Sequence, residues 1–215
     1  MTAKQEFLET EGDAWYARNR AAKQSRNYPD DDRVLNQILE LSDLSPQSSV
    51  LEIGCGGGER LAWLQQSLGY SCSGIEPSAE AVAQAQSSGI KAVQGTADQL
   101  PYPDLTFDLV IFGFCLYLCD RSDLFRIASE ADRVLKTPGW MIVYDFYAET
   151  PIRRPYHHAP GLYSYKMDYR TLFTWHPGYT CYKHELRHHA TGVFTDDPQE
   201  WVALSVLRKD MSRYG

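Results

Sequence analysis

The sequence predicts an α/β protein built on a doubly wound, mostly parallel, seven-stranded sheet. Short apolar segments alternate with amphipathic segments from Val50 to Phe146, which is the pattern of strands joined by crossover helices. Four glycines lie directly after the first of these strands, where such folds bind ligands. The 215 residues, 43% of them hydrophobic, suffice for one packed domain.

The strands are short runs of apolar residues bounded by turn residues. The run Phe107–Phe114 is the most apolar and is expected to be a buried central strand, and Lys136-Thr-Pro-Gly139 ends the helix that precedes the fifth strand. In chain order the seven expected strands are Val50–Ile53, Ser73–Glu76, Ala92–Gln94, Phe107–Phe114, Trp140–Phe146, Tyr179–Ala190 and Trp201–Arg208.

The helices are expected on both faces of this sheet. Apolar residues at helical spacing predict them at Glu59–Leu68, Ala79–Ser87, Asp123–Leu135 and, shorter, Met167–Phe173. One or two helices in residues 1–30 are expected to lie over the core, and another follows Pro29–Arg33. We divide the single domain 1–215 into N-terminal lid helices (1–46), a core (47–150) and a substrate-side insertion with the final strands (151–215).

Composition excludes several classes of function. The net charge of −7 argues against broad nucleic-acid binding, which needs a basic face. No apolar run approaches 18 residues and the N-terminus lacks a signal pattern, so we expect a cytoplasmic protein without a membrane span, a monomer or homodimer. Five scattered cysteines without a CxxC pair predict free thiols and no metal site.

The stretch VLEIGCGGGERLAWL, from Val50 to Leu64, predicts a strand, a glycine turn and a helix that together approach a nucleotide. A dinucleotide fingerprint fails because Glu59 or Leu61 stands where the third glycine is needed, which disfavours a dehydrogenase. The turn also lacks the lysine of a phosphate-binding loop, and Glu59 would repel a phosphate. The turn therefore suits a nucleoside without phosphates.

Two acidic residues follow the next two strands. Glu76 ends the second strand, where a carboxylate can accept hydrogen bonds from both hydroxyls of a ribose. Asp98 lies in a short polar loop after the third strand. Both positions meet the glycine turn at the carboxyl edge of the sheet.

With these motifs the chain resembles the class I S-adenosylmethionine-dependent methyltransferases, in their small-molecule branch, from about Val34 to Tyr147. That resemblance implies a Rossmann-like fold with S-adenosylmethionine as cofactor, Glu76 on the ribose and Asp98 on the adenine amine. The segment RVLKTPGWMIVYDF also matches a family pattern, with departures at Thr137 and Trp140. The cofactor-binding residues implied are Glu52, Gly54, Cys55, Gly56, Glu76, Pro77, Ala97, Asp98, Gln99, Gly113 and Phe114, with Gly58 completing the glycine pattern.

Aromatic and basic residues crowd the chain after Pro151. Residues 151–194 hold six Lys or Arg, two acids and all six histidines, which favours an anionic or saccharide-like acceptor. The alternative for each aromatic ring is a place in the packed core, and for Tyr117 the two interpretations are about equal. The expected acceptor-binding residues are Trp15 and Tyr16 as lid, Tyr117, Tyr147, Tyr156, Tyr163, Tyr165 and Arg153.

The implied reaction is methyl transfer to an oxygen or nitrogen of a small molecule. A general base helps if the acceptor is a hydroxyl, and the first candidates are His157 and His158, then His176, with Asp145 and Tyr147 behind them. Two alternatives stay open: the same fold and cofactor with other chemistry, or a non-catalytic nucleoside-binding regulator.

The segment His184-Glu-Leu-Arg-His188 matches H-E-x-x-H, a pattern of zinc peptidases. Its flanks are β-like, and on a strand residues four apart are separated by about 13 Å. Two such side chains cannot share one zinc ion, so we expect no metal there.

Overall fold

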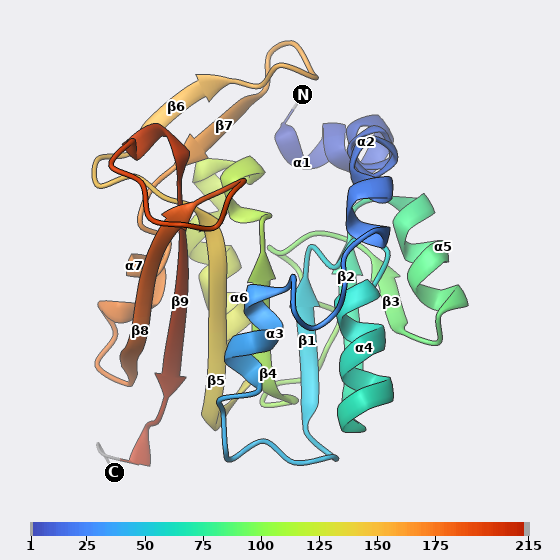
Figure 1. The fold of residues 1–215 in the computed structure, drawn as a ribbon, viewed down its shortest axis with the longest axis vertical. Helices are drawn as coiled ribbons and strands as arrows, with labels where there is room; N and C mark the ends of the chain where they lie inside the picture. Colours follow the sequence, from blue (N-terminus) through green and yellow to red (C-terminus); the bar gives the residue numbers. More distant parts are fainter. Residues whose placement is uncertain (1, 213–215) are drawn as a thin grey trace.

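The computed structural model describes residues 2–212, and its centre is one seven-stranded sheet (Figure 1). Neighbouring strands run in the order β3-β2-β1-β4-β5-β9-β8, with β9 antiparallel to both β5 and β8 and the other pairs parallel. The strands are β1 Ser49–Ile53, β2 Ser71–Glu76, β3 Lys91–Gln94, β4 Phe107–Gly113, β5 Leu135–Phe146, β8 Tyr179–His188 and β9 Trp201–Lys209. The predicted doubly wound, mostly parallel sheet is confirmed.

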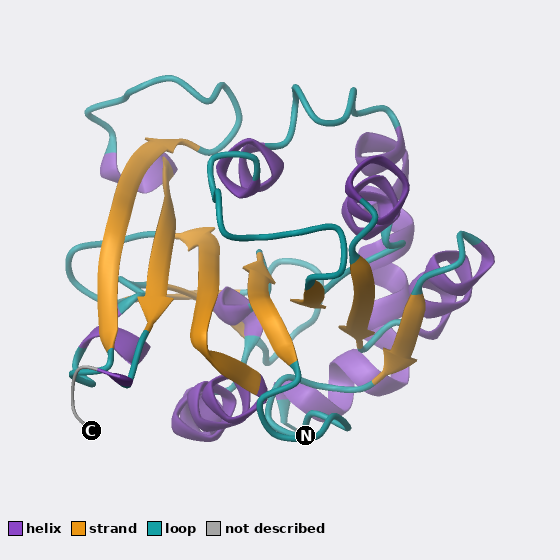
Figure 2. Cartoon of the chain, turned by 90° about the horizontal axis from the view of Figure 1, so that it is seen from below, coloured by secondary structure: helices purple, strands orange, loops and turns teal. Residues whose placement is uncertain are grey.

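Helices cover both faces of the sheet (Figure 2). The helices α3 (Arg33–Ile38), α4 (Glu59–Leu68) and α5 (Ala79–Ser87) share one apolar core with one face of the sheet. The helices α6 (Leu124–Val134) and α7 (Thr171–Thr174) share the other. Successive residues of β4 alternate between the two cores, as the pleat of a strand requires.

Local chemistry explains where these helices begin and end. The helix α4 is bounded by Gly58 and Gly69, both with left-handed backbone (φ 79° and 71°), and α5 is capped by the Ser78 hydroxyl, which accepts a hydrogen bond from Ala81 N. The bounds of both helices agree with the prediction. The predicted helix Met167–Phe173 is wrong in extent: Asp168 accepts a hydrogen bond from Arg170 N, and this local turn replaces the first helical turn.

Two further units lie above the carboxyl ends of the parallel strands (Figure 1). One is the N-terminal lid, which we define as α1 (Ala3–Glu6), the π-helical turn Phe7–Glu11 and α2 (Gly12–Gln24). The other is a two-stranded hairpin of β6 (Ile152–Pro155) and β7 (Tyr163–Lys166), which the sequence did not predict. The short 3-10 turns are Leu116–Leu118, Arg121–Asp123 and Pro198–Glu200. Among the described residues, every helix is too short or too polar to cross a membrane.

Candidate active site

The glycine turn after β1 needs glycine because its backbone is left-handed and closely approached. Gly54 and Gly56 have φ of 78° and 55°. A Cβ atom added to Gly54 would lie 2.8 Å from Cys115 Cβ, and one added to Gly56 would lie 2.5 Å from Lys23 Nζ. Glycine therefore lets the lid and the loop after β4 approach the backbone of this turn closely.

Glu76 braces this turn from the end of β2. Its buried carboxylate accepts a hydrogen bond from Gly56 N at 2.9 Å through Oε2 and one from Ser78 N at 3.2 Å through Oε1. Burial raises the pKa of Glu76, and Lys23 and the two N–H groups oppose the shift. Each oxygen keeps a second lone pair, so the side chain can accept from a ligand while it holds the turn.

Asp98 faces the same space from the loop after β3. Its Oδ1 accepts from the Thr96 hydroxyl at 2.7 Å, and its Oδ2 accepts from Lys4 Nζ at 2.6 Å. Burial acts to raise the pKa of Asp98, but the bonds from Lys4 and Thr96 outweigh it and the pKa is lowered. The carboxylate is therefore ionised at neutral pH and tied to the lid.

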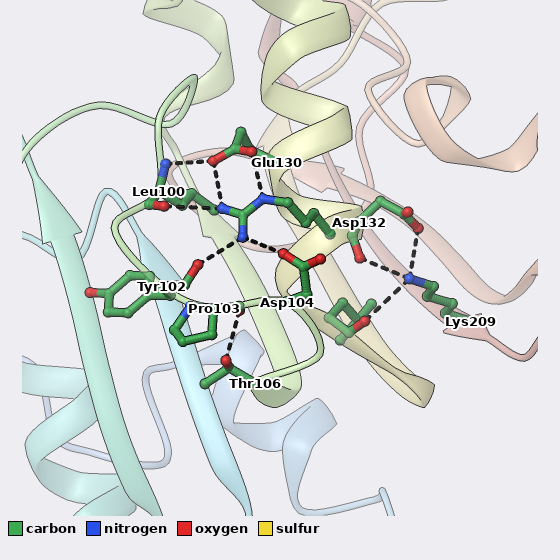
Figure 3. Close-up of polar contacts among 10 residues, drawn as sticks. Leu100, Tyr102, Pro103, Asp104, Thr106, Glu130, Asp132 and Lys209 are labelled. Carbon is green, nitrogen blue, oxygen red and sulfur yellow. Dashed lines mark hydrogen bonds and ion pairs between the residues drawn. The ribbon is translucent and has the colours of Figure 1, made fainter.

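The loop that carries Asp98 is held by Arg133 of α6, the arginine of the RVLKTPGW motif (Figure 3). Its guanidinium donates to the carbonyls of Tyr102 (2.7 Å) and Leu100 (3.0 Å) and pairs with Glu130, which in turn accepts from Leu100 N. These bonds fix the path of the chain between β3 and β4, and sequence reasoning did not assign this role to Arg133.

One cavity of about 790 Å³, counted up to its open mouth, joins these groups. Carboxylates stand at Glu76 and Asp98, and the walls between them are largely apolar. Six of the residues implied to bind cofactor line it, namely Gly54, Glu76, Pro77, Ala97, Asp98 and Phe114, and the lid contributes Ala3, Lys4, Phe7, Gly12 and Trp15. An apolar slot with an acceptor near each end and a bare glycine turn fits a nucleoside.

The other five implied residues lie outside the cavity lining. Glu52 is buried against Arg60, Cys55 packs onto Gly74, and Gln99 is exposed. Gly56 is covered by Lys23, and Gly113 gives room to the Glu52 carboxylate, which lies 2.9 Å from where its Cβ would be. These residues shape the turn from behind.

Comparison with known proteins agrees with this geometry. Residues 51–143 match the family model described as "Methyltransferase domain". Over these residues, which lie in the centre of the chain, the sequence is similar to a methyltransferase domain. An uncharacterized methyltransferase of Synechocystis sp. is 33% identical over 123 residues, covering 56% of this chain and 58% of the relative. The demethylmenaquinone methyltransferase of Shouchella clausii is 34% identical over 114 residues, covering 49% of this chain and 47% of the relative. The chain thus spans about half the length of these relatives.

Solved structures share the fold of this chain. The 1,6-didemethyltoxoflavin-N1-methyltransferase of Burkholderia thailandensis, solved with S-adenosylhomocysteine, has a TM-score of 0.68 and 15% identity, covering 98% of this chain and 92% of its own. An S-adenosylmethionine-dependent methyltransferase of Methanosarcina mazei has a TM-score of 0.64 and 16% identity, covering 83% and 97%.

The loop after β4 is built around the buried carboxylate of Asp145. Asp145 Oδ2 accepts from the backbone N–H groups of Cys115 (3.1 Å) and Leu116 (2.8 Å), while Phe114 adopts a left-handed conformation at φ 55°. Burial raises the pKa of Asp145 to about 7, against the opposing effect of these N–H groups. Strained non-glycine backbone of this kind gathers at functional sites. Asp145 positions the loop, and its oxygens are occupied by backbone.

An aromatic row leads from the cavity toward β5. The ring centroid of Phe114 lies 4.5 Å from that of Tyr144 and 5.3 Å from that of Phe146, which lies 5.0 Å from Tyr117. Trp15 of the lid donates Nε1–H to the Tyr117 hydroxyl at 3.2 Å. Tyr16 instead turns toward Gly57 and is buried. Of the two expected lid residues, Trp15 therefore reaches the cavity and the row, and Tyr16 reaches the glycine turn.

The other expected acceptor contacts hold the insertion together. Tyr156 donates its hydroxyl to Glu11 at 2.8 Å and so ties the hairpin to the lid. Arg153 covers the Tyr163 ring at 4.3 Å, Arg121 covers Tyr165 at 4.1 Å, and Tyr147 is buried against His184. The basic excess of this segment is partly paired internally, as by Arg170 with Asp168 at 2.8 Å and Lys183 with Glu185 at 3.4 Å.

The structure does not bring the three predicted catalytic histidines together. His157 and His158 are exposed in the turn of the hairpin, and His158 packs on Tyr156. His176 precedes β8, whose first residue Tyr179 pairs with the end of β9 and so lies at the edge opposite the cavity. None of the three lines the cavity.

The H-E-x-x-H segment lies on strand β8, as predicted. A different trio, His188, His189 and Glu200, brings its ligand atoms within 4.8 Å of one another. However, Nδ1 of His188 accepts hydrogen bonds from Ala190 N (3.0 Å) and Thr191 N (3.3 Å). Its neutral ring is therefore protonated at Nε2, the atom that faces Glu200, and a metal-binding histidine needs the opposite arrangement.

The bond between Lys4 and Asp98 predicts an effect on cofactor affinity. Because Lys4 Nζ lies 2.6 Å from Asp98 Oδ2 and faces the cavity with it, a ligand amine that binds Asp98 competes with Lys4 for this carboxylate. We expect Lys4→Met to tighten S-adenosylhomocysteine binding, by less than about tenfold since partly exposed ion pairs contribute about 0–1 kcal/mol. Calorimetry would measure this, with Lys91→Met on the exposed side of β3 as control; weaker binding in Lys4→Met would contradict it.

Proposed function

We propose that the protein transfers a methyl group from S-adenosylmethionine to an oxygen or nitrogen of a small polar molecule. The observation that carries this is the single cavity in which Glu76, Asp98 and the glycine turn meet the aromatic row. When bound, the cofactor supplies an electrophilic methyl group. Glu76 would hold the ribose, Asp98 the adenine amine, and the backbone near Gly54 and Phe114 the amino-acid end.

The chain's contribution to catalysis would be mainly alignment and exclusion of water. The strained loop at Phe114 fixes one wall of the cavity, and the lid closes the opposite side with Trp15 against Tyr117. Positioning of this kind can contribute several orders of magnitude to a bimolecular transfer. Burial raises the pKa of Tyr117 well above its ordinary value, so its hydroxyl stays protonated and is a hydrogen-bond donor.

Replacing His157 and His158 of the hairpin tests whether either side chain acts as a general base. We expect the double variant His157→Gln/His158→Gln to keep kcat within about threefold of wild type, because a general base is typically worth about 10²–10⁴-fold and these exposed rings lie off the cavity. Single-turnover methyl transfer would measure it. A loss above 100-fold, with cofactor affinity unchanged, would assign the base to the hairpin.

The proposed activity is tested by incubating the protein with S-adenosylmethionine and panels of small acids, saccharides and phenols. A product heavier by one methylene, formed in step with S-adenosylhomocysteine, would support the proposal. A product with another mass change would favour other chemistry on the same fold. Cofactor binding without any product across acceptors that themselves bind would favour a nucleoside-binding regulator.

A further inference from the structure

We propose that a second pocket, separated from the cofactor cavity by the packed rings of Tyr144 and Phe114, binds the acidic group of the methyl acceptor, with the Arg33 guanidinium as its anchor. This inference rests on the proposed function and gives the acceptor a chemical class: a small hydroxyl-bearing molecule with a carboxylate or phosphate. The pocket lies between the loop after α2, the start of α3, the end of β5 and the loop after β8.

The pocket is large and polar, with a volume of about 910 Å³ counted up to its mouth. Two packed rings stand between it and the first cavity. Tyr144 lines this pocket, Phe114 lines the cofactor cavity, and their ring centroids are 4.5 Å apart. Phe114 belongs to the strained loop, so an acceptor anchored here would have to pass these two rings to reach the methyl group.

Charges around the pocket differ in whether they have partners. Asp32 is buried and satisfied: it accepts from Arg60 Nε at 3.0 Å and from Leu35 N at 3.0 Å. Arg60 also pairs with Glu52, so its charge is neutralised inside the protein. Arg26 reaches Asp32 only at 3.9 Å and is largely exposed. These pairs leave Arg60 and Asp32 with little to offer a ligand.

Arg33 is different, because its partly buried guanidinium forms no hydrogen bond or ion pair with residues 2–212. Its Nη2 end lies against Gly192, where an added Cβ would be 2.0 Å from Nη2 and 3.1 Å from Cζ. Among charged neighbours of Tyr144, Arg33 has the largest effect, lowering the phenol pKa while burial raises it. An unpaired guanidinium beside a phenol offers several donors in the fork geometry that binds carboxylate or phosphate.

Asp30 and Asp31, at the mouth of the pocket, determine which groups the rest of the acceptor can carry. Asp31 accepts from Asn27 N at 2.9 Å and Asp30 from Asn27 Nδ2 at 3.0 Å, and both side chains are exposed. A ligand bearing negative charge throughout would be repelled there. A molecule with one acidic group at Arg33 and hydroxyl groups at the mouth would donate to these carboxylates.

Two variants separate the charge from its position. Arg33→Met removes the guanidinium, and Gly192→Ala displaces it while keeping the charge, since Gly192 has φ 76° and no space for a side chain. Arg20→Met, an exposed arginine on α2, is the matched control. Inorganic phosphate is the probe, followed by nuclear magnetic resonance of the arginine Nε–H signals, with S-adenosylhomocysteine binding measured in parallel.

We expect phosphate to shift the Arg33 signal with millimolar affinity, Arg33→Met and Gly192→Ala to weaken phosphate binding at least fivefold, and Arg20→Met to leave it unchanged. No shift at Arg33, or equal phosphate affinity in all three variants, would overturn the inference. Binding of S-adenosylhomocysteine without binding of phosphate would contradict the anion site at Arg33 alone. Binding of phosphate without binding of S-adenosylhomocysteine would instead contradict the proposed function.

Discussion

Glu76→Gln is expected to weaken S-adenosylhomocysteine binding by about 100-fold. The glutamine keeps one carbonyl oxygen for Gly56 N, so the glycine turn can stay braced. It loses the second acceptor oxygen and the charge, and hydrogen bonds to charged groups are worth about 1.5–3 kcal/mol each. A ribose diol needs two acceptors, so one hydroxyl would face an N–H₂ group instead.

The measurement is calorimetric titration of wild type and variant, with Glu80→Gln as the control because that exposed glutamate lies nearby, in the first turn of α5. The control should bind as wild type does. Circular dichroism would show that the variant is folded. A folded Glu76→Gln protein with affinity within threefold of wild type would place the nucleoside away from Glu76.

Arg60→Met is expected to destabilise the protein by about 3–5 kcal/mol, the usual cost of leaving buried charge without its partner. Arg60 has a side chain only 12% exposed and pairs with both Asp32 and Glu52. The remaining carboxylates would be buried together, with Arg26 at 3.9 Å from Asp32 and the charge of Lys23 acting on Glu52 as the remaining compensation. Denaturant unfolding would measure the loss, and Arg126→Met on the exposed face of α6 should change stability by less than about 0.5 kcal/mol.

The pH dependence of this variant has a definite sign. Burial raises the pKa of Glu52 to about 7, and Arg60 opposes that shift. A carboxyl with a raised pKa in the folded state contributes stability below its unfolded pKa and loses it as the pH rises through the folded pKa. Removing Arg60 raises the pKa of Glu52 further, so the destabilisation should be larger at pH 8 than at pH 5.5.

The double variant Arg60→Met/Glu52→Gln separates lost packing from unpaired charge. Neutralising Glu52 should recover part of the stability lost in Arg60→Met, because one buried charge is then removed. Equal stability of the single and double variants at pH 8 would mean that the charge on Glu52 does not cause the loss.

Residues that begin and end helices allowed much of the fold to be predicted from the sequence. The helices Glu59–Leu68 and Ala79–Ser87 have the predicted bounds because glycine and serine mark their ends. The hairpin was missed because its strands are four residues long, largely polar, and include Pro155. Alternation of apolar residues, the usual signal of a strand, is absent there.

Residues that line the cavity could be predicted from the sequence where a motif residue directly follows a strand of the sheet. Glu76 and Asp98 follow their strands directly, so the sheet edge brings them to one cavity. Lys4 reaches Asp98 across 94 positions of sequence, and Arg33 lies against Gly192, contacts that depend on how the lid and loops pack. The basic residues of 151–194 suggested an anion site, whereas Arg33, which lines the second pocket without an ion pair to any residue of 2–212, is at the start of α3.

A crystal structure with S-adenosylhomocysteine would show most directly whether the nucleoside binds between Glu76 and Asp98. We expect the adenosine in the cavity under the lid, with its ribose hydroxyls on Glu76, its adenine amine on Asp98, and Lys4 moved off that carboxylate. A ligand bound elsewhere, or bound there with Lys4 still on Asp98 and no ligand contact to Glu76, would contradict it.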